Sequence, residues 1–127
     1  MAVCQVLIVD DDQWTRQAMG EILTRAGYKV TLLASGDGLE EQMDRHDFAA
    51  AIIDYNLPQR NGLEIAQSLR QKLPACRIIL ISSEYQPQRQ PVPEAGLVDH
   101  FLAKPFSKHA LLSTLTALCR PGEKKPA

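Results

Sequence analysis

Acidic side chains follow two short apolar runs of this chain, at positions where they could carry out chemistry. Three consecutive aspartates, residues 10–12, come directly after Val6–Val9, and Asp54 comes after a similar run. Consecutive carboxylates are costly when buried, because like charges raise one another's pKa. A hard divalent cation relieves this cost, since carboxylates, carbonyls and water hold Mg²⁺ in proteins. We therefore expect Asp11 and Asp54 to meet in a Mg²⁺ site, while Asp12 caps the helix that follows.

A hydroxyl and an amine follow two further apolar runs. Ser82 and Ser83 end one of them, and Lys104 stands between the other and Pro105. Taken singly, each would be a turn residue or a solvated surface residue. With Asp54 they make a set suited to phosphoryl transfer, which needs a nucleophile, a neutralising cation and hydrogen-bond donors. In this interpretation Asp54 is the nucleophile, Lys104 the cation and Ser82 a donor.

Alternating apolar patterns predict the elements that must position these side chains. Five short runs rich in β-branched residues are expected to be strands: Val6–Val9, Tyr28–Leu33, Ala50–Ile53, Arg77–Ile81 and Val98–Leu102. Helical patterns separate them, which predicts an α/β protein with a parallel five-stranded sheet and helices on both faces. The carboxyl ends of parallel strands share one edge of a sheet. The polar residues that follow the strands should therefore meet there.

Apolar residues three or four positions apart predict which helical faces are buried. The stripes are Trp14, Ala18, Ile22 and Ala26; Leu63, Ala66, Leu69 and Leu73; and Leu111, Leu112, Leu115 and Cys119. A weaker, more polar helix is expected over residues 37–45. The segment from Ser83 to Gly96 carries Pro87, Pro91 and Pro93. Because an interior proline costs a helix about 3 kcal/mol, a fourth helix there should be short or distorted.

Length and composition limit the class of protein. The 127 residues suit one domain, which we expect over residues 1–120, with a disordered polar tail over 121–127. A net charge of −1 argues against a general grip on nucleic acid or an anionic membrane. No apolar run approaches the ~20 residues of a membrane span, and the first residues lack a signal-peptide pattern. The expected location is cytoplasmic. The three cysteines form no C-x-x-C pair, so a zinc site has no support.

The motifs, taken in order, resemble the receiver (response regulator) domain of bacterial two-component and phosphorelay signalling systems. They are LIVDDD at 7–12, DYNLP at 54–58 with Gly62 beyond it, ILISS at 79–83 and FLAKPF at 101–106. The resemblance extends from about Val6 to Leu118. It implies a flavodoxin-like, doubly wound sheet with the strand order 2-1-3-4-5. It also implies a phosphoacceptor in signal transduction that assists its own phosphorylation and dephosphorylation, rather than an enzyme.

The resemblance assigns the acidic residues to a metal and to the phosphoryl group. Asp54 would accept that group from the histidine of a sensor histidine kinase or His phosphotransfer protein. Asp11, Asp54 and the carbonyl of Asn56 would bind Mg²⁺, and Asp10 would assist, often through water. Asn56 would also flank the path of the water that removes the phosphoryl group, as would Glu84. The phosphorylated form would switch protein contacts.

The resemblance assigns the remaining motif residues to the phosphate and to the switch. Lys104, the Ser82 hydroxyl and the Ser83 backbone N–H would bind the phosphate. Ser82 and Phe101 would be the switch residues, and the Lys104–Pro105 bond would be cis. Ser82 stands where threonine is more frequent, and Phe101 lacks the hydroxyl of a tyrosine. Both keep the group that the switch moves.

Two matters stay open from the sequence. The proline-rich segment replaces much of the helix that the family uses for dimers or targets, so the downstream target and any phosphorylation-dependent dimer are undetermined. The domain could be a stand-alone regulator, a relay intermediate or part of a hybrid kinase or longer regulator. Two alternative classes are an interaction module that keeps the fold without switching and a hydrolase with an aspartate nucleophile. The second would place an acid where Asn56 stands.

Overall fold

The computed structural model describes residues 4–57, 61–82 and 97–119. Strands and helices alternate for most of the chain. The elements are β1 (Gln5–Val9), α1 (Gln13–Arg25), β2 (Lys29–Leu33), α2 (Leu39–Arg45), β3 (Ala50–Asp54), α3 (Gly62–Lys72), β4 (Arg77–Ser82), β5 (His100–Ala103) and α4 (Lys108–Leu118). The expected proline-bearing helix and the tail 121–127 lie outside the described residues. Within the described ranges, no helix has the length and apolar character needed to cross a membrane.

One parallel sheet of five strands forms the centre of the molecule. Its order is β2-β1-β3-β4-β5, which confirms the flavodoxin-like topology implied by the motifs. The registers bring the strand ends together, because Val9 pairs with Leu33 of β2 and with Ile53 of β3, and Asp54 pairs with Ile81 of β4. The carboxyl ends of β1, β3 and β4 therefore lie at the same edge of the sheet.

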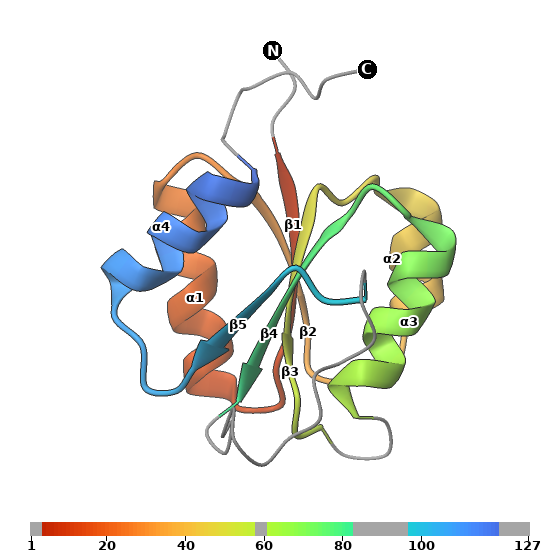
Figure 1. Ribbon diagram of the computed structural model, residues 1–127, viewed down its shortest axis with the longest axis horizontal. Coiled ribbons are helices and arrows are strands. Elements are labelled where there is room, and N and C mark those ends of the chain that lie inside the picture. The colour runs from red at the N-terminus through yellow and green to blue at the C-terminus, as the bar shows by residue number, and fades with distance from the viewer. Residues whose placement is uncertain (1–3, 58–60, 83–96, 120–127) are drawn as a thin grey trace.

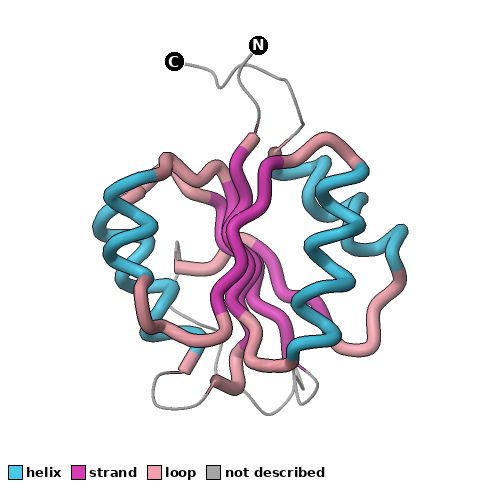
Figure 2. The backbone as a smooth tube through the Cα atoms, turned by 180° about the vertical axis from the view of Figure 1, so that it is seen from behind, coloured by secondary structure: helices cyan, strands magenta, loops and turns pink. Residues whose placement is uncertain are grey.

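Two helical layers cover the sheet. Figures 1 and 2 show α1 and α4 on one face and α2 and α3 on the other. β1 and β3 are buried on both faces, as strands in the middle of a parallel sheet must be. The side chains of Ile8 and Ile52 pack toward α1 and α4, whereas those of Leu7 and Ile53 pack toward α2 and α3. Residues that alternate along each strand thus serve two separate cores.

The predicted buried face of α1 was wrong. Trp14 is 75% exposed, and Ala18 and Ala26 are exposed, whereas Met19 and Leu23 are buried. A strict spacing of four residues drifts around a helix that has 3.6 residues per turn, so the four stripe positions cannot share one face. The stripes of α3 and α4 were predicted correctly, since their central residues are buried.

Asp99 anchors the short strand β5 to its neighbours. Its carboxylate accepts hydrogen bonds from the backbone N–H of Ile78 at 2.7 Å and from Arg70 Nη2 at 2.9 Å. Its own N–H donates to the carbonyl of Ile78 at 2.8 Å. β5 has only four residues and starts at His100, two positions later than expected. The anchor therefore fixes the start of the strand whose other end leads to Lys104.

Gly62 lets α3 begin directly against the backbone behind Asp54. A Cβ at this position would lie 2.6 Å from the Asp54 carbonyl oxygen, 2.9 Å from Tyr55 Cα and 2.9 Å from Leu80 Cδ1. The Gly62 N–H donates to the Tyr55 carbonyl at 2.9 Å, and Asn61 caps the helix. Backbone atoms cannot move aside as a flexible side chain can, so only glycine fits here.

We predict that Gly62→Ala lowers the free energy of unfolding by about 1–3 kcal/mol, the usual cost of overpacking. The physical reason is the contact with the Asp54 and Tyr55 backbone. Urea unfolding followed by circular dichroism measures the change. Gln67→Ala is the matched control, because Gln67 is an exposed residue of the same helix. Equal midpoints for Gly62→Ala and wild type would contradict the prediction.

Candidate functional site

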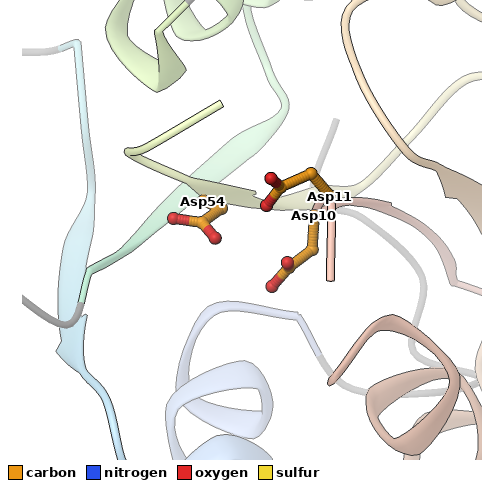
Figure 3. A group of neighbouring side chains, drawn as sticks. All are labelled: Asp10, Asp11 and Asp54. Atoms are coloured by element: carbon orange, nitrogen blue, oxygen red, sulfur yellow. The ribbon is translucent and has the colours of Figure 1, made fainter. Parts of the chain in front are cut away.

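Three aspartates meet at the carboxyl edge of the sheet. Asp10 and Asp11 follow β1, and Asp54 is the last residue of β3. Figure 3 shows the three side chains next to one another, and one carboxylate oxygen from each lies within 4.8 Å of the others. The strand registers cause this meeting, since β1 and β3 are adjacent and end together. The predicted acidic cluster is therefore present in the structure.

Lys104 neutralises two of these carboxylates. Its Nζ lies 3.0 Å from Asp54 Oδ2 and 3.2 Å from Asp10 Oδ2. The side chains of Asp10 and Asp54 are 0% and 8% exposed, whereas that of Lys104 is 21% exposed. Buried charges persist in proteins only when they are paired. Lys104 therefore links the ends of β1, β3 and β5 through one ammonium group.

Burial and charge shift the pKa values of this cluster. Burial raises the pKa of Asp10 above its ordinary value, and the charge of Asp54 raises it further; the Asp12 N–H and Lys104 only partly offset this. Burial lowers the pKa of Lys104, but its hydrogen bond to Asp54 and the charges of Asp10 and Asp54 outweigh that effect and raise it. Lys104 therefore holds its proton firmly, while the ionised form of Asp10 is destabilised.

The remaining hydrogen bonds orient the carboxylates. Asp10 Oδ1 accepts from the Asp12 N–H at 2.9 Å, and Asp54 Oδ1 accepts from the Asn56 N–H at 3.0 Å. Asp11 is exposed, and within the described part of the chain its carboxylate makes no hydrogen bond or ion pair. Asp11 is thus the aspartate of the cluster that is ready to take a new ligand.

Asp12 acts as the predicted helix cap rather than as a member of the cluster. Its carboxylate accepts from the Thr15 N–H at 2.8 Å and from the Thr15 hydroxyl at 2.6 Å. These two bonds hold the pKa of Asp12 below its ordinary value. The cap closes the first turn of α1 immediately beside the site.

The donor set fits Mg²⁺. Mg²⁺ prefers oxygen ligands, and proteins usually supply one or two carboxylates while waters complete the shell. Asp10, Asp11 and Asp54 supply carboxylate oxygens, and Asn56 lies at the rim with its N–H bonded to Asp54. A cation would also offset the burial and the repulsion from Asp54 that together raise the pKa of Asp10. Lys104 partly fills this role when no metal is bound.

Ser82 and Pro105 also lie at this edge, whereas Phe101 lies within β5. Ser82 ends β4 and is buried, and its carbonyl accepts from the Lys104 N–H at 3.0 Å. Phe101 is half-buried and packs on the α2–α3 side of the sheet. The Lys104–Pro105 peptide bond is cis, as the resemblance implied. Ser83, like Glu84, lies outside the described residues.

Sequence reasoning did not find Arg16. Its Nη1 donates to the backbone carbonyl of Asp10 at 2.8 Å. An arginine six residues away from its partner produces no periodic pattern. The one sequence feature that could have indicated this contact is an arginine in the first turn of the helix that follows the three aspartates.

The chain belongs to the response regulator receiver domain family, whose model matches residues 6–116. Among curated relatives, it is 30% identical over 117 residues to the transcriptional regulatory protein GltR of Pseudomonas aeruginosa, covering 91% of this chain and 48% of that protein. The chain spans 16–48% of the length of the first curated relatives it matches. Receiver domains are phosphoacceptors of two-component signalling, and they interact with histidine kinases or phosphotransfer proteins.

Solved structures agree with the family and with the fold. The chemotaxis protein CheY4 of Vibrio cholerae is 29% identical with a TM-score of 0.84, and the match covers 92% of this chain and 99% of that one. The response regulator TrrA of Thermotoga maritima, solved in complex with Mg²⁺ and beryllium fluoride, is 25% identical with a TM-score of 0.77, covering 91% and 98%. The acidic cluster thus stands in a fold whose relatives include a magnesium complex.

We predict that Asp10→Asn stabilises the metal-free protein at neutral pH. The folded pKa of Asp10 is raised above its value of 3.8 in model compounds, so the folded state binds this proton more tightly than the unfolded state. The stabilisation that Asp10 contributes is therefore fully present below pH 3.8. It is lost as the pH rises through the pKa of Asp10 in the folded state. Asparagine does not ionise, so it avoids this loss of stability, and its side-chain oxygen can still accept a hydrogen bond from the Asp12 N–H.

Urea midpoints in EDTA at neutral and acid pH measure this effect, and the gain should shrink on acidification. Asp12→Asn is the matched control, because the pKa of Asp12 is lowered and asparagine is also a good cap. That control should not gain stability at neutral pH. A lower midpoint for Asp10→Asn at neutral pH would show that the ion pair outweighs the burial.

Proposed function

We propose that this domain accepts a phosphoryl group on Asp54 from the phosphohistidine of a sensor histidine kinase or His phosphotransfer protein, and thereby switches its protein contacts. The observation that carries the proposal is the position of Lys104 Nζ, which contacts Asp54 and Asp10 at one edge of the sheet. A nucleophilic carboxylate, a cation and a free acidic ligand are the parts that phosphoryl transfer needs. The magnesium-bound relative supports the same use of the pocket.

The chemistry would proceed at Asp54. A carboxylate oxygen forms a bond to phosphorus, the bond from phosphorus to the donor imidazole nitrogen breaks, and the imidazole leaves with the bonding pair and takes a proton. Lys104 then pairs with the new phosphate oxygens instead of the carboxylate. Mg²⁺, held by Asp11, Asp54 and the Asn56 carbonyl with Asp10 assisting through water, would neutralise charge on the transferring group. The hydrogen bonds that orient the Asp10 and Asp54 carboxylates support this proposal.

Two groups complete the proposed phosphate site and switch. The Ser82 hydroxyl, at the end of the neighbouring strand, and the Ser83 N–H would donate to the phosphate oxygens. Movement of Ser82 toward the phosphate would let Phe101 change its packing against the α2–α3 side. Such a switch is a shift between two conformers that bind the phosphate unequally. A phosphorylation-dependent dimer and the identity of the target stay predictions, as do the domain limits 1–120 and 121–127.

The acceptor is tested with acetyl phosphate and Mg²⁺, followed by intact-mass spectrometry. Wild type should gain one phosphoryl group, and Asp54→Asn should gain none, because the nucleophilic oxygen is lost. Asp47→Asn is the matched control, since Asp47 is an exposed aspartate before β3. Equal labelling of Asp54→Asn and wild type would reject Asp54 as the acceptor.

A protein donor must also contact the surface around Asp54. Trp14, on the first turn of α1, is 75% exposed, although large aromatic residues are usually buried. Ala18, about one helical turn along α1 from Trp14, lines a groove together with Ile22, Pro105, Phe106 and Lys104, the partner of Asp54. Exposed tryptophans often dominate the energy of protein contacts. The proposed donor would therefore dock over Trp14 and this groove.

We predict that Trp14→Ala lowers the rate of transfer from a phosphohistidine protein by about tenfold or more, which corresponds to a modest interface hot spot. Its rate of labelling by acetyl phosphate should stay unchanged. Leu32→Ala is the control, because Leu32 is the other exposed large apolar residue of the described chain, 41% exposed and on β2. If Trp14→Ala lowers the labelling rate with acetyl phosphate as much as the rate with the phosphohistidine protein, the substitution damages the phosphorylation site and not the docking of the donor.

A further inference from the structure

Arg16 contacts the acidic loop through the backbone. Its Nη1 lies 2.8 Å from the carbonyl oxygen of Asp10, and its side chain is half-buried. We infer that Arg16 is a positioning residue for the cation site: it fixes the loop 10–12 so that the Asp11 carboxylate is presented to Mg²⁺. The inference rests on the proposed function, in which Asp11 is a metal ligand.

The Asp10 carbonyl needs a partner from outside the sheet. The pairing of β1 with its neighbours ends at Val9. The Asp10 N–H still reaches the Leu33 carbonyl at 3.1 Å, which ties one side of the residue to β2. Arg16 supplies the donor for the other side. Without Arg16, the bond from the Asp12 N–H to Asp10 Oδ1 would still hold this turn, but the Asp10 carbonyl would lose its side-chain donor.

Hydrogen bonds of Arg16 and Asp12 connect α1 to the loop of residues 10–12. The Asp12 carboxylate bonds forward to Thr15, which fixes the start of α1 on the loop. The Arg16 side chain bonds backward to Asp10, which fixes the loop on α1. Asp11 lies between these two anchors. Its own carboxylate is exposed and makes no bond within the described chain, so the backbone alone fixes the direction in which this side chain leaves the chain.

Whether substitution of Arg16 strengthens or weakens Mg²⁺ binding distinguishes a positioning role of Arg16 from an effect of its charge. A positive charge beside a cation site weakens cation binding, so removing Arg16 for its charge alone would tighten Mg²⁺. Removing a group that orients the ligand loop would weaken it, as loss of the groups that orient metal ligands typically costs 10–100-fold in affinity. The two roles therefore predict opposite outcomes for the same substitution.

Calorimetric titration of the full chain with MgCl₂ at neutral pH tests the inference. Arg16→Met should raise the Kd for Mg²⁺ by about tenfold. Arg16→Lys keeps the charge and one donor, and it should recover part of the affinity. Arg25→Met is the matched control, because it removes the same charge from the exposed far end of the same helix. Arg25→Met should leave the Kd unchanged or lower it slightly.

A metal-free measurement follows the loop itself. The Asp12 N–H bonds to Asp10 Oδ1, so its amide exchange reports the loop geometry without any cation. Exchange at Asp12 should be faster in Arg16→Met than in Arg25→Met, at equal exchange in the core of β3. Exchange that is equal in both variants, or a Kd for Arg16→Met that is unchanged or lower, would overturn the inference.

Labelling by acetyl phosphate separates failure of this inference from failure of the proposed function. If Arg16 acts through the cation site, Arg16→Met is labelled slowly at low Mg²⁺ and regains the wild-type rate at saturating Mg²⁺. A rate that stays low at saturating Mg²⁺ would overturn the positioning role. If wild type itself binds no Mg²⁺ and is not labelled, the proposed function fails, and the amide exchange of Asp12 still decides whether Arg16 holds the loop.

Discussion

Burial of two neighbouring carboxylates at one edge of the sheet is the constraint on which the rest of this structure depends. Asp10 and Asp54 are almost fully buried and lie at the ends of adjacent strands. Lys104, the residue that follows the edge strand β5, compensates both buried charges. Its side chain must reach past the end of β4 to contact both acids, which a long flexible amine can do. The strand order therefore determines how close Asp10 and Asp54 lie to each other and how far the Lys104 side chain must extend to contact them.

Hydrogen bonds between side chains and the backbone help give the site its shape. Gly62 brings α3 against the peptide that follows Asp54, and the Asn56 N–H turns back onto the Asp54 carboxylate. Asp10 is held in the same way by the Asp12 N–H and by Arg16 at its carbonyl. The carboxylates of Asp10 and Asp54 are thus each held by a backbone N–H two residues further along the chain. Preorganisation of this kind lowers the cost of placing a cation and a phosphate.

The fold and the acidic cluster could be predicted from the sequence for one physical reason. Parallel strands end at a common edge, so the polar residues that follow apolar runs, such as Asp54 and Lys104, must converge. The buried face of α1 could not be predicted in this way, because Trp14 and Ala18 fit an apolar spacing as well as Met19 and Leu23 do. Arg16 could not be found either, since a side chain that binds a backbone carbonyl leaves no pattern in residue types.

The ends of the described fold lie away from the acidic pocket. β1 enters the sheet at the edge opposite Asp10, and α4 ends where the Tyr28 hydroxyl donates to the Cys119 carbonyl at 2.7 Å, beside the start of β2. Curated relatives carry the matching region as 16–48% of their length. With this arrangement, evolution can join the same unit to unlike neighbours by gene fusion. A domain joined at either end of the described fold would start on the side of the sheet away from the acidic pocket.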